Sequence, residues 1–124
     1  MTPKPPSPGS PDAPRKMVQV TTTTPSRDLA VQIAEAAVTE GLAACAQVLG
    51  PLESTFRWQG AVDQATEWYC HCKTTSDRLS DLEHRIRELH PSEVPEIIAV
   101  PIVGGSAAYL AWIEQTVTPP GRPD

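Results

Sequence analysis

One strand pattern in this sequence is longer than the domain that carries it. Residues 43–59 alternate as a strand that is interrupted only at Gly50-Pro51, and 17 residues at about 3.3 Å each would extend about 56 Å. Between its two proline-rich ends the chain holds about 102 residues, and a compact domain of that size is only about 33 Å across. The pattern therefore predicts a bent β-hairpin that extends beyond its own protomer.

Aromatic residues on this hairpin predict self-association. Phe56 and Trp58 alternate onto one face, a turn is expected over residues 60–64, and residues 65–75 return as the antiparallel partner strand. Exposed aromatic side chains on an overhanging ribbon are costly unless a partner covers them. The residues that we expect at an interface between copies of this chain are Phe56, Trp58, Trp68, Pro91 and Trp112.

The remaining patterns complete a mixed fold. Residues 17–24 are β-branched and alternating, which predicts a strand, and an apolar helical stripe follows from Ser26 to Gly41. A second helix is expected from Ser76-Asp77 to His90-Pro91, and residues 97–103 suit a central strand with one side unpaired at Pro101. A last helix follows Gly104-Gly105-Ser106. The order β-α-β-β-α-β with an extra C-terminal helix predicts an α+β sandwich of the split βαβ, ferredoxin-like type.

Proline marks the ends of this domain. Six of the 14 prolines fall in residues 1–14 and three in residues 119–124. Such segments bury too little apolar surface to order themselves. We therefore expect disordered tails at 1–16 and 119–124 and a single domain at 17–118.

Charge and hydropathy exclude several classes of partner. Residues 17–118 carry thirteen Asp/Glu against six Lys/Arg, and this net charge of −7 repels nucleic acid. No apolar stretch approaches the length that spans a bilayer, so no membrane partner is expected. The N-terminus lacks the apolar segment of a signal peptide, and the three cysteines are an odd number. These features predict reduced thiols in a cytoplasmic protein.

Cys70-His71-Cys72 has two interpretations. On a strand the cysteines share one face and His71 lies on the other, so the three cannot bind one ion together. Two thiolates suit Cu(I), but two small thiols buried in the core beside Trp68 are the favoured interpretation. Cys45 is also expected in the core. Because hairpin pairing that sums to about 125 sets Cys70 opposite Thr55, no disulfide to Cys45 is expected.

The loop from His90 to Glu96 is the best candidate site. Two prolines stiffen it, and His90, Glu93 and Glu96 offer an imidazole and two carboxylates to a divalent ion. The alternative is that His90 and Glu96 bind backbone groups and hold the loop at an interface. No set of nucleophile, base and orienting residue is recognisable, so the chain is not expected to be an enzyme.

Several short segments together resemble one known family. They are Gly41-Leu42-Ala43-Ala44-Cys45, Trp58-Gln59-Gly60, Lys73-Thr74-Thr75, His90-Pro91-Ser92-Glu93-Val94-Pro95-Glu96-Ile97, Pro101-Ile102, Gly104-Gly105 and Tyr109-Leu110-Ala111-Trp112-Ile113. In order and spacing they are similar to the CutA family of divalent-cation tolerance proteins. The resemblance covers nearly all of residues 17–118 and neither tail. It implies a ferredoxin-like protomer in a tight homotrimer whose hairpins and sheet edges pair between subunits.

The resemblance also implies a role in the response to metal ions. Copper binding in some members involves a cysteine near the end of the first strand and histidines at the His-Pro turn. Here Thr22 stands at the cysteine position and Leu89 precedes His90, so only His90 remains of that set.

Two functions follow as hypotheses. The first is a homotrimeric tolerance protein with weak contacts to Cu or Zn and no required cofactor. The second is a trimeric signalling or scaffold protein of the PII type that binds a small molecule or a protein in clefts between subunits.

Overall fold

The computed structural model describes residues 15–121. Its elements in chain order are β1 (Met17–Thr24), α1 (Arg27–Thr39), β2 (Cys45–Trp58), β3 (Ala61–Thr75), α2 (Leu79–Leu89), β4 (Ile97–Pro101) and α3 (Ala107–Thr116). The strands form one antiparallel sheet in the order β2-β3-β1-β4. The α+β class, the βαββαβ order and the extra C-terminal helix that the sequence predicts are thus confirmed.

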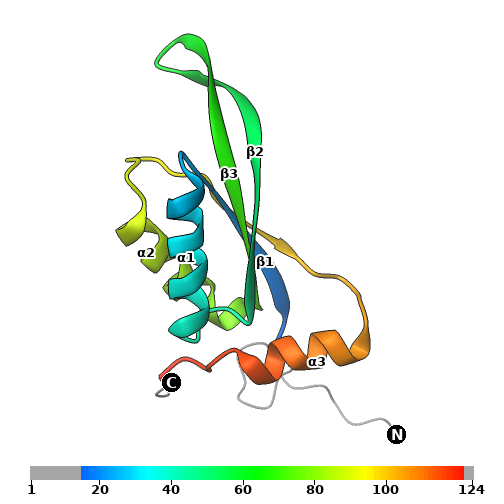
Figure 1. Cartoon of the computed structure of the whole chain (residues 1–124). Helices are drawn as coiled ribbons and strands as arrows, with labels where there is room; N and C mark the ends of the chain where they lie inside the picture. Colours follow the sequence, from blue (N-terminus) through cyan, green and yellow to red (C-terminus); the bar gives the residue numbers. More distant parts are fainter. Residues whose placement is uncertain (1–14, 122–124) are drawn as a thin grey trace, which may run out of the picture.

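Helices α1 and α2 cover one face of the sheet (Figure 1). The Ser26 side chain accepts a hydrogen bond from the Leu29 amide and caps α1, and Gly41 follows the helix at φ 73°, a left-handed conformation that glycine adopts without strain. Ile33 of α1 and Leu82 of α2 are fully buried against the sheet. Among residues 15–121, no helix has the length and apolar character needed to cross a membrane.

The opposite face of the sheet is covered only at one end. Helix α3 lies across that end (Figure 1), where Ile113 and Val117 are buried in a second, smaller apolar cluster. Residues opposite one another in an antiparallel sheet point to the same face, so the register places Thr21, His71 and Ile98 on this side. We call the part of this face that α3 leaves bare the uncovered sheet face. Its side chains are Gln19, Thr21, Thr23, Gln47, Leu49, Tyr69, His71, Lys73, Ile98 and Val100.

Strands β2 and β3 extend together well beyond the helices (Figure 1), as the length of the pattern predicts. The turn expected at residues 60–64 is wrong. Trp58 pairs with Ala61, and only Gln59 and Gly60 lie between the strands, both with positive φ (49° and 83°). This geometry is a two-residue type I′ turn, whose twist matches that of the strands. Asp63 and Gln64 are exposed residues of the overhanging part of β3. Their polar side chains resemble those of a turn, which is why the sequence pattern predicted one there.

The tight turn and one irregularity change the hairpin register from the one expected. Pairing shifts between Leu49 and Leu52, at the expected interruption. Cys70 consequently faces Val48 and not Thr55. Cys45 pairs with Lys73, and its side chain points to the other face of the sheet from that of Cys70. These opposite faces, and not a pairing of Cys70 with Thr55, keep the two thiols apart. All three cysteines are free.

Strand β4 lies at an edge of the protomer's sheet and not at its centre. It pairs only with β1 and ends at Pro101, and its residues Ile98 and Val100 remain 53% and 46% exposed. Its apolar sequence suggested burial on both sides, but in the single protomer one edge and one face are open. Pro101, which lacks an N–H, correctly indicated an unpaired side.

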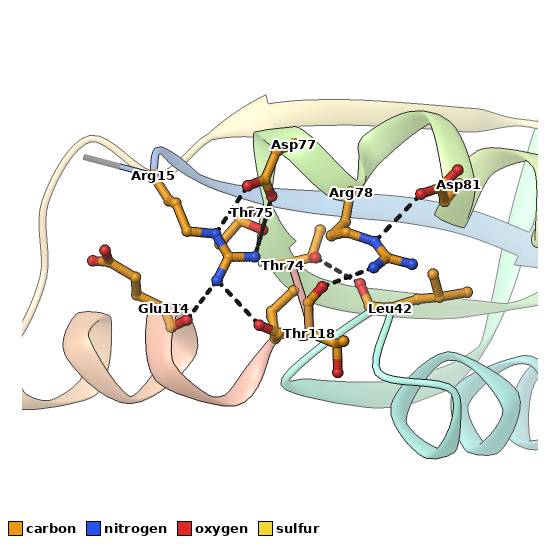
Figure 2. A network of polar contacts seen from close by, with 10 residues as sticks. Arg15, Leu42, Thr74, Thr75, Asp77, Arg78, Asp81, Glu114 and Thr118 are labelled. Atoms are coloured by element: carbon orange, nitrogen blue, oxygen red, sulfur yellow. Dashed lines mark hydrogen bonds and ion pairs between the residues drawn. The ribbon is translucent and has the colours of Figure 1, made fainter. Parts of the chain in front are cut away.

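Arg15, two residues before the predicted domain boundary at residue 17, contacts residues of the folded domain. The Arg15 guanidinium donates to the Asp77 carboxylate at 3.0 Å, to the Glu114 carbonyl at 2.7 Å and to the Val117 carbonyl at 3.1 Å. Figure 2 shows Arg15 between Asp77 and Glu114. Arg15 also donates to the Thr75 hydroxyl at 2.8 Å. Arg15 was assigned to the tail because sequence patterns cannot show such long-range polar contacts. The other tail residues lie mostly outside the described range.

Candidate functional site

A groove of about 890 Å³ separates the overhanging hairpin from the loop that joins α2 to β4. Thr23 at the end of β1 lies at its base, β2 and β3 form one wall, and the loop beginning at His90 forms the other. The lining residues are Thr23, Leu52, Glu53, Ser54, Thr55, Phe56, Arg57, Trp58, Asp63, Glu67, Tyr69, His90, Ser92, Glu93, Val94, Pro95 and Glu96. The hairpin overhang and the candidate loop therefore define one concave site.

Acidic and aromatic side chains dominate this groove. Glu53, Asp63, Glu67, Glu93 and Glu96 supply five carboxylates, against a single guanidinium from Arg57. Aromatic rings come from Phe56, Trp58 and Tyr69. Carboxylate oxygens attract hard divalent cations, and the excess of negative charge raises their local concentration.

His90 is held by backbone groups on both sides of its ring. Its Nε2 lies 2.6 Å from the Thr23 carbonyl oxygen, and its Nδ1 accepts from the Ser92 amide at 3.1 Å. A carbonyl can only accept, so the ring proton is on Nε2, and both nitrogens are occupied. The imidazole thus ties the loop to the end of β1, which is the alternative role that the sequence left open.

Glu93 and Glu96 line the same groove but do not join His90 in a ligand cluster. Both residues are exposed. Residues 15–121 contain no group of three or more His, Cys, Asp or Glu side chains arranged to hold a metal ion. One protomer therefore brings the three predicted ligands to one groove without forming a preorganised site.

Replacing His90 with alanine is expected to lower the free energy of unfolding by about 1 kcal/mol, because the Ser92 amide and the Thr23 carbonyl lose a partner. Urea unfolding followed by circular dichroism measures this loss. His84→Ala is the matched control, since the His84 side chain on α2 is 76% exposed. Equal stability of the two variants would contradict the role assigned to His90.

Cys70 and Cys72 pack in the core, as the favoured interpretation predicted. Both are fully buried on the helix-covered face, with their sulfur atoms 3.9 Å apart. The hydrogen bond that the Cys72 thiol makes to Cys70, together with burial, raises the pKa of Cys72. Cys45 differs from expectation: it is half-buried on the opposite face, where its sulfur lies 3.3 Å from the Tyr109 hydroxyl.

Thr22 and Leu89, the two positions at which the resemblance implies other residues in copper-binding relatives, lie in packed surroundings. Thr22 is fully buried on the helix-covered face, and within residues 15–121 its hydroxyl has no hydrogen-bond partner. Leu89 is half-buried against the main apolar cluster. Neither side chain offers a donor to an ion in the groove.

Four of the five residues expected at an interface are exposed in the protomer. Phe56 and Trp58 lie on the hairpin, Pro91 on the loop and Trp112 on α3, and the three aromatic residues are 39–50% exposed. Trp68 is instead half-buried against the protomer's own core cluster. Trp68 alternates along β3 with Cys70 and Cys72 and so lies on the helix-covered face, which explains this contact.

Comparison with known proteins agrees with the fold. A family model described as CutA1 divalent ion tolerance protein matches residues 18–116. The chain belongs to the CutA1 family. The divalent-cation tolerance protein CutA of Thermus thermophilus is 43% identical over 93 residues, which are 75% of this chain and 90% of that protein.

A solved structure and a second relative agree with this assignment. The solved structure of the divalent cation tolerance protein (Cut A1) from Thermus thermophilus has a TM-score of 0.80 to this chain at 40% identity, and the match covers 82% of this chain and 99% of that one. Protein CutA of Mus musculus is 34% identical over 111 residues, 90% of this chain but 63% of the mouse protein. The whole described fold is therefore that of the family.

Sequence reasoning missed two parts of this surface. Glu53 and Glu67 line the groove, although their strand positions gave no sign that they face the loop. The apolar side chains of Ile98 and Val100 were assigned to a buried strand and are exposed instead. The available signal was the alternation of Ile98 and Val100 along the strand, which predicts that both side chains lie on the same face of the sheet.

Proposed function

We propose that this chain is a homotrimeric divalent-cation tolerance protein that acts by weak contact with divalent ions and not by catalysis. The observation that carries this proposal is the match of residues 18–116, in sequence and in fold, to the CutA1 family. The acidic groove supplies the chemistry, because its five carboxylates attract cations without forming a preorganised site. Weak and exchangeable binding is the expected consequence.

The uncovered sheet face and the overhanging hairpin support assembly. Leu49, Ile98 and Val100 are 62%, 53% and 46% exposed on that face, and Trp58 is 50% exposed at the hairpin tip. Exposed apolar side chains on open edge strands are costly in water and are covered when copies associate. A closed trimer would cover the face in all three copies equally.

Sedimentation velocity at micromolar concentration tests the assembly, and a trimer is the expected species. Ile98→Asp places a charge on the uncovered sheet face and is expected to shift the protein to smaller species. Val38→Asp is the matched control, because Val38 is an apolar residue on α1 with 42% exposure and lies on the helix layer. A stable monomeric wild type would overturn the trimer.

Calorimetric titration with Cu(II) and Zn(II) tests the cation contact. The wild type is expected to give weak, saturable heats, and the double variant Glu93→Gln/Glu96→Gln is expected to lose most of them. Glu35→Gln, on the exposed side of α1 and outside the groove, is expected to bind like the wild type. Unchanged binding in the double variant would assign the ions to another site.

We further propose that the protein works in the cytoplasm. Its three cysteines are free, and two of them are buried 3.9 Å apart without a bond. Reduced thiols persist in a reducing compartment. Cell fractionation measures the location, and recovery outside the cytoplasm would contradict this assignment.

A further inference from the structure

His71 lies near the middle of the uncovered sheet face. It is half-buried on β3, one of the two central strands, with its ring stacked on Tyr69 at a centroid distance of 5.0 Å. Its Nδ1 is 2.9 Å from the Thr21 hydroxyl and 3.3 Å from the side-chain amide nitrogen of Gln19, both on β1. The imidazole is thus fixed in place by two strands.

These contacts select the neutral ring. The Gln19 amide nitrogen can only donate, so Nδ1 accepts and the ring proton is on Nε2. A second proton on Nδ1 would place two N–H groups against each other. The protonated ring would therefore lose the Gln19 hydrogen bond.

A protonated Nδ1 could donate to the Thr21 hydroxyl, but among the described residues no carboxylate lies close enough to His71 to offset a positive charge. Lys73, two residues along the same strand, repels it, and its amine is bound to the Gln47 side chain on β2. Burial lowers the pKa of His71, and the Lys73 charge lowers it further. The nearest carboxylate on this face of β3 is Glu67, four residues away at about 13 Å. The other groups that face His71 are Tyr69 on β3, Gln19 and Thr21 on β1, Gln47 on β2 and Ile98 and Val100 on β4.

We propose that His71 makes assembly of this protein pH-dependent: when the imidazole takes up a proton, copies that are joined through the uncovered sheet face separate. The inference rests on the proposed homotrimer. Exposed Ile98 and Val100 favour covering this face, whereas a protonated His71 on the same face, close to Lys73, opposes it. His71 is therefore the titratable group that decides between the two states.

The direction of the effect follows from proton linkage. In the separated protomer the pKa of His71 lies below its ordinary value of 6.5, and covering the face in the trimer buries the ring further and lowers the pKa again. Protons thus bind better to separated copies than to the trimer. Assembly is strongest at neutral and higher pH and weakens as the pH falls through the pKa of the separated protomer. Because a trimer holds three such rings, up to about three protons are taken up on dissociation.

Subunit exchange measures this effect directly. Natural and nitrogen-15-labelled trimers are mixed at about pH 8 and at about pH 5, and native mass spectrometry follows the mixed species. The wild type is expected to exchange at least about tenfold faster at the lower pH. His71→Gln keeps a polar side chain that does not titrate, and His71→Leu makes the face more apolar. Both are expected to show less than about a twofold difference.

A matched control separates His71 from the other histidines. His84→Gln removes an exposed imidazole on α2 and is expected to keep the full wild-type pH effect. A wild-type exchange rate that does not change with pH, or a pH effect that persists in His71→Gln, would overturn the switch while leaving the trimer intact. A wild type that is monomeric at about pH 8 would overturn the trimer and the switch together.

Discussion

Arg15→Ala is expected to lower the free energy of unfolding by about 3 kcal/mol, because hydrogen bonds that involve a charged group contribute about 1.5–3 kcal/mol each. The Arg15 side chain is only 17% exposed and donates to Asp77, Thr75 and the carbonyls of Glu114 and Val117. Helix α3 has no basic residue in its last turn, so Arg15 supplies the positive charge that its C-terminus favours. Guanidine unfolding followed by circular dichroism measures the loss.

Two controls test whether the guanidinium itself is responsible. Lys16→Ala changes the exposed neighbour and is expected to be neutral within about 0.5 kcal/mol. Arg15→Lys keeps the charge but cannot reach four acceptors at once, so it is expected to recover less than half of the loss. An Arg15→Ala protein as stable as Lys16→Ala would show that the network in Figure 2 contributes nothing.

The Arg15 contribution is also expected to depend on pH. Burial alone would raise the pKa of Asp77, but hydrogen bonds from Arg15 and Thr75 and the charges of Arg15 and Arg78 outweigh it and leave the pKa below its usual value. A carboxylate with a lowered folded-state pKa adds stability above its unfolded pKa, and that stability is lost as the pH falls through the folded-state value. The stability difference between wild type and Arg15→Ala should therefore shrink under acid conditions.

The sequence predicted local structure better than strand position. Period-two and helical patterns located all four strands and three helices, and capping residues such as Ser26 and Gly41 marked the helix ends correctly. The assignment of residues 97–103 to the sheet centre failed because β4 is apolar although it lies at an open edge of the protomer's sheet, with Ile98 and Val100 exposed. Composition alone does not distinguish such an edge strand from one that is buried inside the protomer.

The candidate site shows a similar limit. Proline spacing and the residues of the His90–Glu96 loop located one wall of the groove, but the opposing wall depends on a register that a two-residue turn and one irregularity set. Because the expected turn was wrong, the sequence placed Cys70 opposite Thr55, whereas the structure pairs it with Val48. The role of His90 could not be chosen from sequence either, because the Thr23 carbonyl that binds it is 67 residues away.

Gly50→Ala is expected to lower the free energy of unfolding by about 2 kcal/mol, within the range measured for overpacked sites. A Cβ atom at position 50 would lie 2.5 Å from Cδ1 and 2.8 Å from Cγ of Trp68, and 3.1 Å from the Glu67 carbonyl oxygen. Trp68 packs against the core cluster, so it cannot retreat without losing apolar contacts. Gly50 thus permits the hairpin to bend over the indole ring where pairing shifts between Leu49 and Leu52.

Thermal and urea unfolding of a matched set of variants test this explanation. Gly104→Ala is the control, since a Cβ atom there meets nothing within 4 Å, and its expected effect is within about 0.5 kcal/mol. Trp68→Leu removes the ring that the new methyl group would strike. If the clash is the cause, Gly50→Ala should cost less in the Trp68→Leu background than in the wild type, so the two changes should be non-additive by about 1 kcal/mol or more. Simple additivity would instead place the cost of Gly50→Ala in the backbone of the bent strand and not in the indole contact.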